Sequence, residues 1–206
     1  MVRKTKAEAE VTRQTLLRAA LRVFSRRGYV AARLEEIASE AGVTRGAIYW
    51  HFASKADLYT ALIADASARL DQVIAGALAE GGGSFLESTR RVMIRMLAYL
   101  EEDETYRATQ SLLVLTVGAE GESDPGRSQQ VSEAQVKGRE LAEIMRAGMA
   151  AGQFRADLIP EEAARAMLAY LNGLMLQWLL APATFSIKAS APALVDIYIR
   201  GIAAQP

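Results

Sequence analysis

The chain has 206 residues, a length that fits one large or two small domains. It contains no Cys, which excludes a disulfide framework and a thiolate metal site, and a single His, which excludes a multi-histidine metal site. Residues 1–60 hold eleven Lys and Arg against six Asp and Glu, a net charge of +5, whereas residues 61–206 hold thirteen against eighteen, a net charge of −5. No apolar run reaches the length of a membrane span and no apolar signal segment follows the charged N-terminus, so we expect a soluble cytoplasmic protein without membrane partners.

The first predicted helix covers residues 12–27. Its apolar residues recur at helical spacing and define an inner face, which consists of Leu16, Leu17, Ala20, Leu21 and Phe24. Arg26 and Arg27 complement the helix dipole at the C-terminal end, and Gly28 ends the helix.

A helix, a turn and a short helix follow. The first of them, residues 34–41, has an apolar face made by Leu34, Ile37, Ala38 and Ala41. Gly42 provides the bend and Thr44 the N-cap of a short helix, which is too short to be stable alone and carries more polar and aromatic residues than a core needs. This pattern is typical of a helix-turn-helix that faces DNA, and the basic charge of this end agrees with it. The alternative is an ordinary helical hairpin with Tyr49 and Trp50 in its core.

The rest of the chain is also predicted to be helical, because it lacks the alternating pattern of β-strands. Residues 54–57 resemble a capping box and begin a fourth helix, to about residue 79, long enough to connect the N-terminal segment with the remainder. Residues 81–83 are interpreted as a linker, since they lack the Lys and Ser or Thr of a phosphate loop. Five further helices are expected, at about residues 84–102, 105–117, 128–151, 160–181 and 192–203, which gives an all-α fold of about nine helices.

The predicted eighth helix is apolar nearly all round between residues 167 and 180. A surface helix needs one apolar stripe, so this helix must be covered on two sides. Either a second copy of the chain covers the other side of this helix, or the helix lies at the centre of a monomer. The predicted ninth helix also has a wide apolar face, made by Leu194, Ile197, Tyr198, Ile199 and Ile202.

Residues 12–58 resemble the DNA-binding domain of TetR-family transcriptional repressors. The family pattern Ile-Ala-x-x-Ala-Gly-Val is matched by residues 37–43, the pattern Ile/Leu-Tyr-x-His/Tyr-Phe by residues 48–52, and a nearby Lys by Lys55. Within the family the chain most resembles the multidrug-efflux repressors of the AcrR/TtgR kind, and this similarity extends to short stretches between residues 169 and 180.

The resemblance implies two domains: a three-helix DNA-binding domain in residues 1–56, which contains the helix-turn-helix, and a helical ligand-binding and dimerisation domain in residues 57–206. It also implies a homodimer that pairs through the last two long helices. The expected interface residues are Trp178, Tyr198, Ile199 and Ile202. We therefore expect a ligand-responsive repressor that binds a palindromic operator in double-stranded DNA, controls a multidrug efflux operon and is released by a hydrophobic small molecule.

The resemblance further implies that the third helix lies in the major groove. Arg45 is then the base reader, since its guanidinium can bind guanine bidentately. His51 and Lys55 are expected at phosphates. Arg33 departs from the family, which usually has a capping Ser or Thr there, and is expected to reach a phosphate instead. The residues expected at DNA are Arg33, Thr44, Arg45, Gly46, Ala47, Tyr49, Trp50, His51 and Lys55.

A ligand cavity among the fifth to eighth helices is likewise implied by the resemblance. Methionine and apolar side chains suit ligands of varied shape, although plain core packing is the alternative for each residue. The expected lining is Val92, Met93, Met96, Gln110, Leu113, Leu141, Ile144, Leu168, Leu171, Asn172 and Met175. Gln110 and Asn172 are the expected polar anchors, because burying an amide without a partner costs about 1–3 kcal/mol. No cofactor and no metal are expected.

An enzyme is not expected, because the sequence has no HExxH, no phosphate loop, no Gly-x-Ser-x-Gly and no Cys, and its only His lies in the DNA motif. The alternatives left open are a TetR-type regulator of metabolic genes, an activator, and a helical interaction module that binds no duplex. Binding of duplex DNA separates the last alternative from the others.

Overall fold

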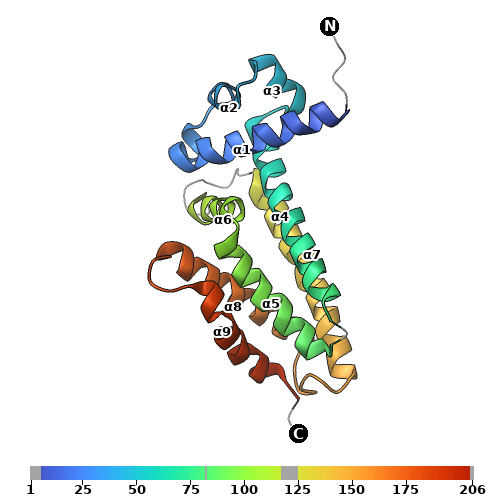
Figure 1. Ribbon diagram of the computed structural model, residues 1–206. Coiled ribbons are helices and arrows are strands. Elements are labelled where there is room, and N and C mark those ends of the chain that lie inside the picture. The colour runs from blue at the N-terminus through green and yellow to red at the C-terminus, as the bar shows by residue number, and fades with distance from the viewer. Residues whose placement is uncertain (1–5, 82, 117–124, 205–206) are drawn as a thin grey trace. The chain divides into compact units, whose positions relative to one another are not determined.

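The computed structural model describes residues 6–81, 83–116 and 125–204 (Figure 1). Within these residues the chain forms helices and an isolated bridge between Phe154 and Ala203, which confirms the predicted all-α fold. The helices are α1 Lys6–Ala31, α2 Leu34–Glu40, α3 Arg45–His51, α4 Lys55–Ala79, α5 Phe85–Glu102, α6 Glu104–Thr116, α7 Pro125–Ala150, α8 Pro160–Leu180 and α9 Ile187–Ile202. In the described ranges, no helix combines the length and the apolar character that crossing a bilayer requires.

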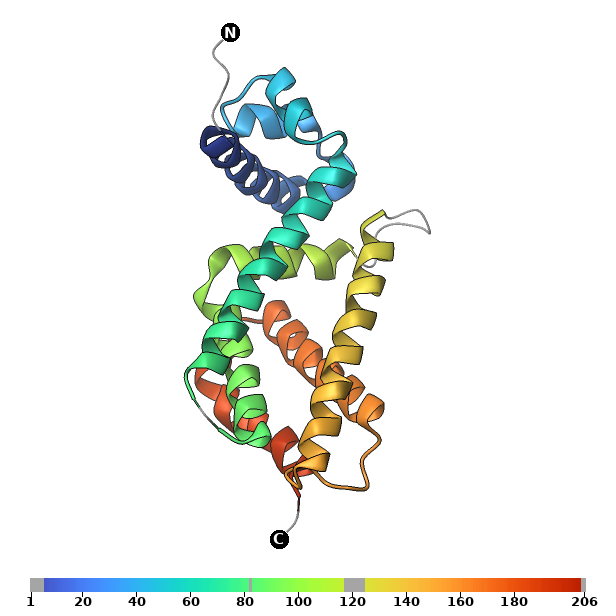
Figure 2. The same cartoon turned by 90° about the vertical axis from the view of Figure 1, so that its right-hand side faces the viewer.

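The described residues divide into two compact units. Unit 1 takes its residues from 1–68 and 105–126, and unit 2 from 69–104 and 127–206. α4 is one continuous helix, whose first part belongs to unit 1 and whose second part belongs to unit 2 (Figure 2). Most of α6 belongs to unit 1, so the compact unit that holds the helix-turn-helix is larger than residues 1–56. We therefore propose residue 56 as the end of the DNA-binding domain in function, and not as the boundary of a compact unit.

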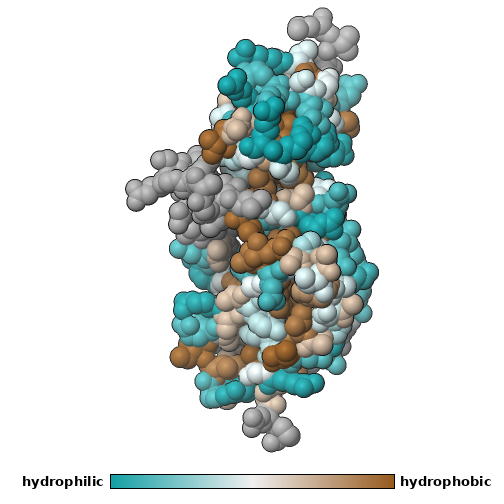
Figure 3. Space-filling view, turned by 90° about the vertical axis from the view of Figure 1, so that its left-hand side faces the viewer, coloured by the Kyte–Doolittle hydropathy of each residue, from teal (hydrophilic) through white to brown (hydrophobic). Residues whose placement is uncertain are grey.

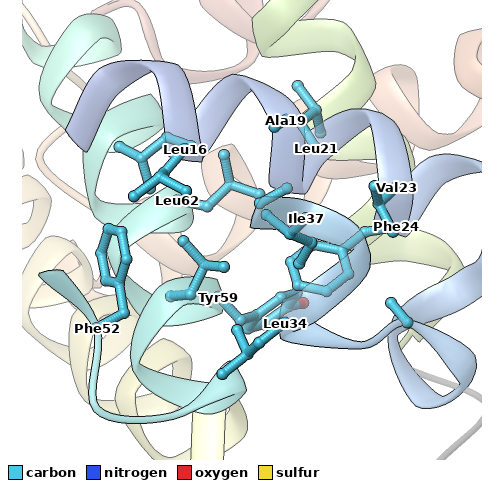
Figure 4. Packing of buried hydrophobic residues seen from close by; sticks show 14 of the residues in the cluster. Leu16, Ala19, Leu21, Val23, Phe24, Leu34, Ile37, Phe52, Tyr59 and Leu62 are labelled. Atoms are coloured by element: carbon cyan, nitrogen blue, oxygen red, sulfur yellow. The ribbon is translucent and has the colours of Figure 1, made fainter. Parts of the chain in front are cut away.

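The core of unit 1 consists of buried aliphatic and aromatic side chains, which come mainly from α1, α2, α3 and α4 (Figure 4). Leu16 of α1, Ile37 of α2 and Ile48 of α3 are each 0% exposed. Leu112 of α6 belongs to the same cluster. Because α2 and α3 have only seven residues each, they depend on this burial for their stability.

The ends of two helices differ from the sequence expectation. α9 begins at Ile187 rather than near residue 192, because the Ser186 hydroxyl caps it by accepting a hydrogen bond from the Ala189 N–H at 3.0 Å. Pro192 consequently lies inside α9. α1 begins earlier than expected, and Gly28, with a φ of 75°, interrupts its helical backbone where the sequence predicts its end.

The centre of unit 2 is built by α5, which packs against α8 and α9. Leu97 and Leu100 of α5 and Val195 of α9 are each 0% exposed. An ion pair at the edge of this contact joins Arg90 Nε to Asp196 Oδ1 at 2.6 Å. The hydrogen bond from Arg90 holds the pKa of the Asp196 carboxyl below its usual range.

Candidate DNA-reading surface and ligand cavity

The turn and the cap that the sequence predicts between α2 and α3 are both present. Gly42 has a φ of 67°, in the left-handed region that glycine enters without strain. The Thr44 hydroxyl accepts a hydrogen bond from the Ala47 N–H at 3.2 Å and caps α3. On the inner side, Ile48 and Phe52 are 0% and 2% exposed. α3 is therefore fixed to the core by one face, and its other face is left to solvent.

The outer face of α3 carries a cation and two large aromatic side chains. The Arg45 side chain is 71% exposed, and Trp50 and Tyr49 are 71% and 44% exposed. Gly46 and Ala47 add little bulk beside Arg45. Tyr49 and Trp50 are therefore not core residues, which excludes the alternative of an ordinary helical hairpin with both side chains in its core. Exposed aromatic surface of this extent is typical of an interaction site.

His51 and Arg33 lie beside this face in different ways. The half-buried His51 ring stands edge-on to Trp50, with 4.6 Å between the ring centroids. Arg33 is exposed at the N-cap of α2, where its backbone N–H donates to Glu36 Oε2 at 3.2 Å. Arg has no side-chain acceptor, so the bond that a capping Ser or Thr would accept from the Glu36 N–H is missing, and that N–H donates to the Arg33 carbonyl oxygen at 3.1 Å instead. The Arg33 guanidinium is thus not needed for the cap.

Lys55 has a structural role that differs from the expected phosphate contact. Its ammonium donates to the backbone oxygens of Tyr29 at 2.7 Å, Val30 at 2.9 Å and Ala32 at 3.1 Å. An ammonium has three N–H donors, so these carbonyl groups occupy all of them. Lys55 therefore joins the start of α4 to the end of α1, and a phosphate contact would require the loss of one of these bonds.

Replacing Lys55 by Met is expected to destabilise unit 1 by about 1.5–3 kcal/mol, the range for hydrogen bonds to a charged group. Met keeps most of the apolar stem and removes the ammonium. Thermal unfolding followed by circular dichroism measures the change. Arg18→Met is the matched control, because Arg18 is an exposed cation of the same unit whose guanidinium makes a long, 3.5 Å contact with the Thr15 hydroxyl. Equal unfolding temperatures for both variants would contradict the structural role of Lys55.

Glu35 of α2 also belongs to this surface, although its sequence context did not indicate it. Its carboxylate lies 3.2 Å from the Arg45 guanidinium and 3.4 Å from the Tyr49 hydroxyl. The two helices of a helix-turn-helix are known to pack against each other, but this general rule does not identify the side chains that face one another.

Unit 2 contains a cavity of ≈ 480 Å³, within the size range of small-molecule sites. Its wall comes from α4, α5, α7 and α8. The expected residues that line it are Val92, Met93, Met96, Leu141, Ile144, Leu168 and Leu171. Leu70, Ile74 and Leu78 of α4 also line it and were not expected, because their spacing fits ordinary core packing equally well.

The remaining expected lining residues lie elsewhere. Gln110 and Leu113 belong to α6 in unit 1, where Leu113 packs against the core of that unit. Asn172 is exposed on α8, and neither Asn172 nor Met175 lines the cavity. Because water reaches the exposed Asn172 amide, its hydrogen bonds can be satisfied without a ligand.

The polar groups of the cavity come from residues that no sequence pattern indicated. Thr89 of α5 is 9% exposed and lines the cavity, as does the half-buried Ser88. Asp71 of α4 and Lys137 and Glu140 of α7 also line the cavity. The cavity thus offers a mostly apolar wall, two hydroxyl residues and a few charged groups.

The residues expected at a dimer interface are mostly used inside the protomer. Trp178 is 3% exposed, and its indole N–H donates to the carbonyl oxygen of Phe185 at 3.0 Å. Ile199 and Ile202 are 7% and 4% exposed. The half-buried Tyr198 donates its hydroxyl to a carbonyl of α8 at 2.7 Å, and burial raises the pKa of Tyr198 to about 12. These side chains therefore stabilise the protomer, and the expectation does not hold for them.

Another apolar stripe remains exposed on α8 and α9, and we call it the α8–α9 stripe. On α8 its members are spaced three and four residues apart: Ala166, Ala169, Gly173, Leu176 and Leu180. On α9 they recur every fourth residue: Ala189, Ala193 and Ile197. Leu180 and Ile197 are 71% and 65% exposed. Figure 3 shows hydrophobic surface on the side of unit 2 where Figure 1 has these two helices. Such spacing is typical of helices that pack side by side.

Known proteins match both parts of the chain. Residues 16–62 match the family model of the bacterial regulatory proteins of the tetR family, and residues 84–203 match that of the C-terminal region of MAATS-type transcriptional repressors. The chain is 34% identical over 200 residues to the HTH-type transcriptional regulator AcrR of Shigella flexneri. The matched residues make up 97% of this chain and 93% of AcrR.

Solved structures of regulators share the fold. NalD, the secondary repressor of the MexAB-OprM multidrug efflux pump in Pseudomonas aeruginosa, is similar with a TM-score of 0.80 and 26% identity, over 96% of this chain and 98% of NalD. The SmeT–triclosan complex is similar in fold with a TM-score of 0.81 and 24% identity, over 95% of this chain and 93% of SmeT. Since the second family model spans more than half of the chain and AcrR matches nearly all of it, the chain belongs to the TetR family of bacterial transcriptional regulators and is not an enzyme.

Proposed function

We propose that this protein represses transcription as a homodimer on a palindromic operator, and that a hydrophobic small molecule in the cavity of unit 2 releases it. The observation that carries the proposal is the outer face of α3, which exposes Arg45, Tyr49 and Trp50 in a TetR-family chain. A protein that binds chromosomal DNA works in the cytoplasm of a bacterium.

In this proposal α3 lies in the major groove. Arg45 reads a guanine through its guanidinium, and Gly46 and Ala47 let the helix approach the bases closely. Tyr49 and Trp50 contact phosphate and thymine methyl groups. The residues left for phosphate contacts at the groove edge are Arg33, Thr44 and His51, whereas Lys55 holds α1.

Replacing Arg45 by Ala is expected to lower affinity for the preferred duplex by about 1–3 kcal/mol and to relax the preference at the base it reads. Random duplex should lose less, because phosphate contacts carry most of its affinity. Fluorescence anisotropy on duplexes with single base changes measures both effects. Arg26→Ala is the control, since Arg26 belongs to α1 and pairs with Glu40 at 2.7 Å. The same loss on every duplex would show that Arg45 does not read a base.

The α8–α9 stripe is the proposed dimer interface. Two copies that bury it against each other form a four-helix contact with small residues at the closest approach. A two-fold dimer presents two α3 helices, which read half-sites about one helical turn apart. The palindromic operator follows from this symmetry.

The ligand we propose is a hydrophobic, preferably aromatic molecule with a group that can hydrogen-bond the Thr89 hydroxyl. The cavity is mostly apolar, and the Thr89 hydroxyl is a polar group of its lining to which such a ligand can hydrogen-bond. Triclosan, which is bound in the SmeT complex, is a suitable first probe.

α4 provides the connection between ligand and DNA. It lines the cavity through Leu70 and Ile74, and the same continuous helix places Leu58 in the core of unit 1. A ligand that binds more tightly to the state of α4 that does not fit the operator shifts the dimer away from DNA. The size of this shift is limited by the difference in ligand affinity between the two states.

The proposed target is a multidrug efflux operon, since NalD and SmeT are both named as repressors of multidrug efflux pumps. Sequencing of the transcripts in a strain that lacks this protein tests the target. We expect a pump operon to rise in that strain and to rise in the parent when triclosan is added. A strain in which only metabolic genes respond would contradict the efflux target and leave DNA binding intact.

A further inference from the structure

Glu35 of α2 makes contacts with both of the long polar side chains on the outer face of α3. Its Oε1 atom lies 3.2 Å from Arg45 Nη2 and accepts a hydrogen bond from the Tyr49 hydroxyl at 3.4 Å. The Arg45 guanidinium carbon in turn lies 5.7 Å from the centroid of the Tyr49 ring. All three side chains belong to unit 1, and one carboxylate contacts both Arg45 and Tyr49.

These contacts do little for stability. The Glu35 and Arg45 side chains are 46% and 71% exposed, and an exposed ion pair contributes about 0–1 kcal/mol. A carboxylate on a DNA-facing surface also repels phosphate. Glu35 therefore weakens any DNA complex through repulsion of phosphate, and the small contribution of its ion pair to folding stability does not offset this repulsion.

The other carboxylates of α2 serve different partners. Glu36 caps the N–H of Arg33 and lies 3.3 Å from Arg27. Glu40 binds Arg22 and Arg26 of α1, whose hydrogen bonds hold the pKa of Glu40 below its usual range. Among the carboxylates of this helix, Glu35 is the one that contacts the reading face.

Arg45 can keep its contact with Glu35 while it reads a base. A guanidinium has five N–H donors, and a bidentate contact with guanine uses two of them. A carboxylate on a remaining donor orients the fork before DNA arrives, which reduces the entropy lost on binding. On a random duplex, where Arg45 seeks a phosphate, the same carboxylate opposes the contact.

We propose that Glu35 is a specificity-determining residue, which positions Arg45 and Tyr49 for base contacts and opposes non-specific binding to phosphate. The proposal rests on the proposed function, in which α3 reads DNA. It predicts changes of opposite sign on operator and random DNA, which the loss of a negative charge alone does not produce.

The test uses the full-length protein, a duplex that the wild type selects from a random pool, and a scrambled duplex of the same length and composition. With Glu35→Gln we expect affinity for the selected duplex to fall about two- to fivefold and affinity for the scrambled duplex to rise about two- to fivefold, the scale of one exposed ion pair. The salt dependence of the scrambled complex should steepen.

Two variants separate positioning from charge. Glu40→Gln removes the same charge from the same helix and should move both affinities by the same factor. Glu35→Asp keeps the charge on a shorter side chain, so scrambled binding should stay near the wild-type value while operator affinity falls. Equal unfolding temperatures establish that the variants are folded.

A parallel change on both duplexes with Glu35→Gln, or no change on either, would overturn the role of Glu35 and leave the proposed function in place. If the wild type enriches no sequence from the pool, both the reading of DNA by α3 and the role of Glu35 are wrong.

Discussion

Replacing Ile197 by Asp is expected to convert the dimer to a monomer and to abolish operator binding. Ile197 is 65% exposed in the protomer and lies on the α8–α9 stripe. In a two-fold dimer the change places two carboxylates in one apolar interface, and an uncompensated buried charge costs about 3–5 kcal/mol. We therefore expect the dissociation constant of the dimer to rise at least about a hundredfold.

Sedimentation velocity at micromolar concentration measures the assembly, and anisotropy measures operator binding. Ile159→Asp is the matched control, because Ile159 is 62% exposed and lies outside the stripe, at the N-cap of α8. Asp is a favourable N-cap, so the control should remain a stable dimer. An Ile197→Asp protein that still sediments as a dimer would exclude this face as the interface.

Replacing Val92 by Trp is expected to give a repressor that binds its operator and no longer responds to ligand. Val92 lines the cavity wall on α5. The larger ring takes up space that a ligand needs, and overfilling a packed site costs about 1–3 kcal/mol, so ligand affinity should fall about tenfold or more. Operator affinity without ligand should change little, because α3 and its supports lie in unit 1.

Calorimetry with triclosan measures ligand affinity, and anisotropy measures release from the operator. Val136→Trp makes the same substitution at a residue of α7 that is 42% exposed and does not line the cavity. Its response to ligand should match the wild type. Normal release of Val92→Trp by triclosan would place the inducer outside this cavity.

The helix-turn-helix could be predicted from the sequence because its signals are local. Gly42 enters a left-handed turn, Thr44 caps the next helix, and Ile48 and Phe52 repeat at the spacing of a buried face. Each signal depends on a few neighbouring residues, and each appears in the structure where the sequence predicts it.

Side-chain roles that depend on distant partners could not be predicted in this way. Lys55 meets carbonyl groups more than twenty residues earlier in the chain, and no local pattern indicates them. The apolar width of α8 indicated two covered sides but did not show which side each residue faces. Trp178 consequently lies in the protomer core, whereas Leu180, two residues later, is exposed.

The assignment of cavity residues was limited for the same reason. A buried apolar residue and a cavity-lining one have the same spacing, so Leu70 of α4 could not be distinguished from core. Asn172 was expected to be buried because its sequence neighbours are apolar, but it lies on an exposed face. Periodicity predicts the face of a helix, and only the packing of the other helices decides what covers that face.

The most direct test is a titration of the wild-type protein, bound to its selected duplex, with triclosan and a panel of hydrophobic antimicrobials and plant phenolics. Anisotropy follows the DNA complex, and calorimetry follows ligand binding to the free protein. We expect at least one compound to bind the cavity and to release the duplex over the same concentration range, and we expect Val92→Trp to prevent both. A compound that fills the cavity while the operator complex stays intact would contradict a ligand-responsive repressor, as would a panel in which no compound binds.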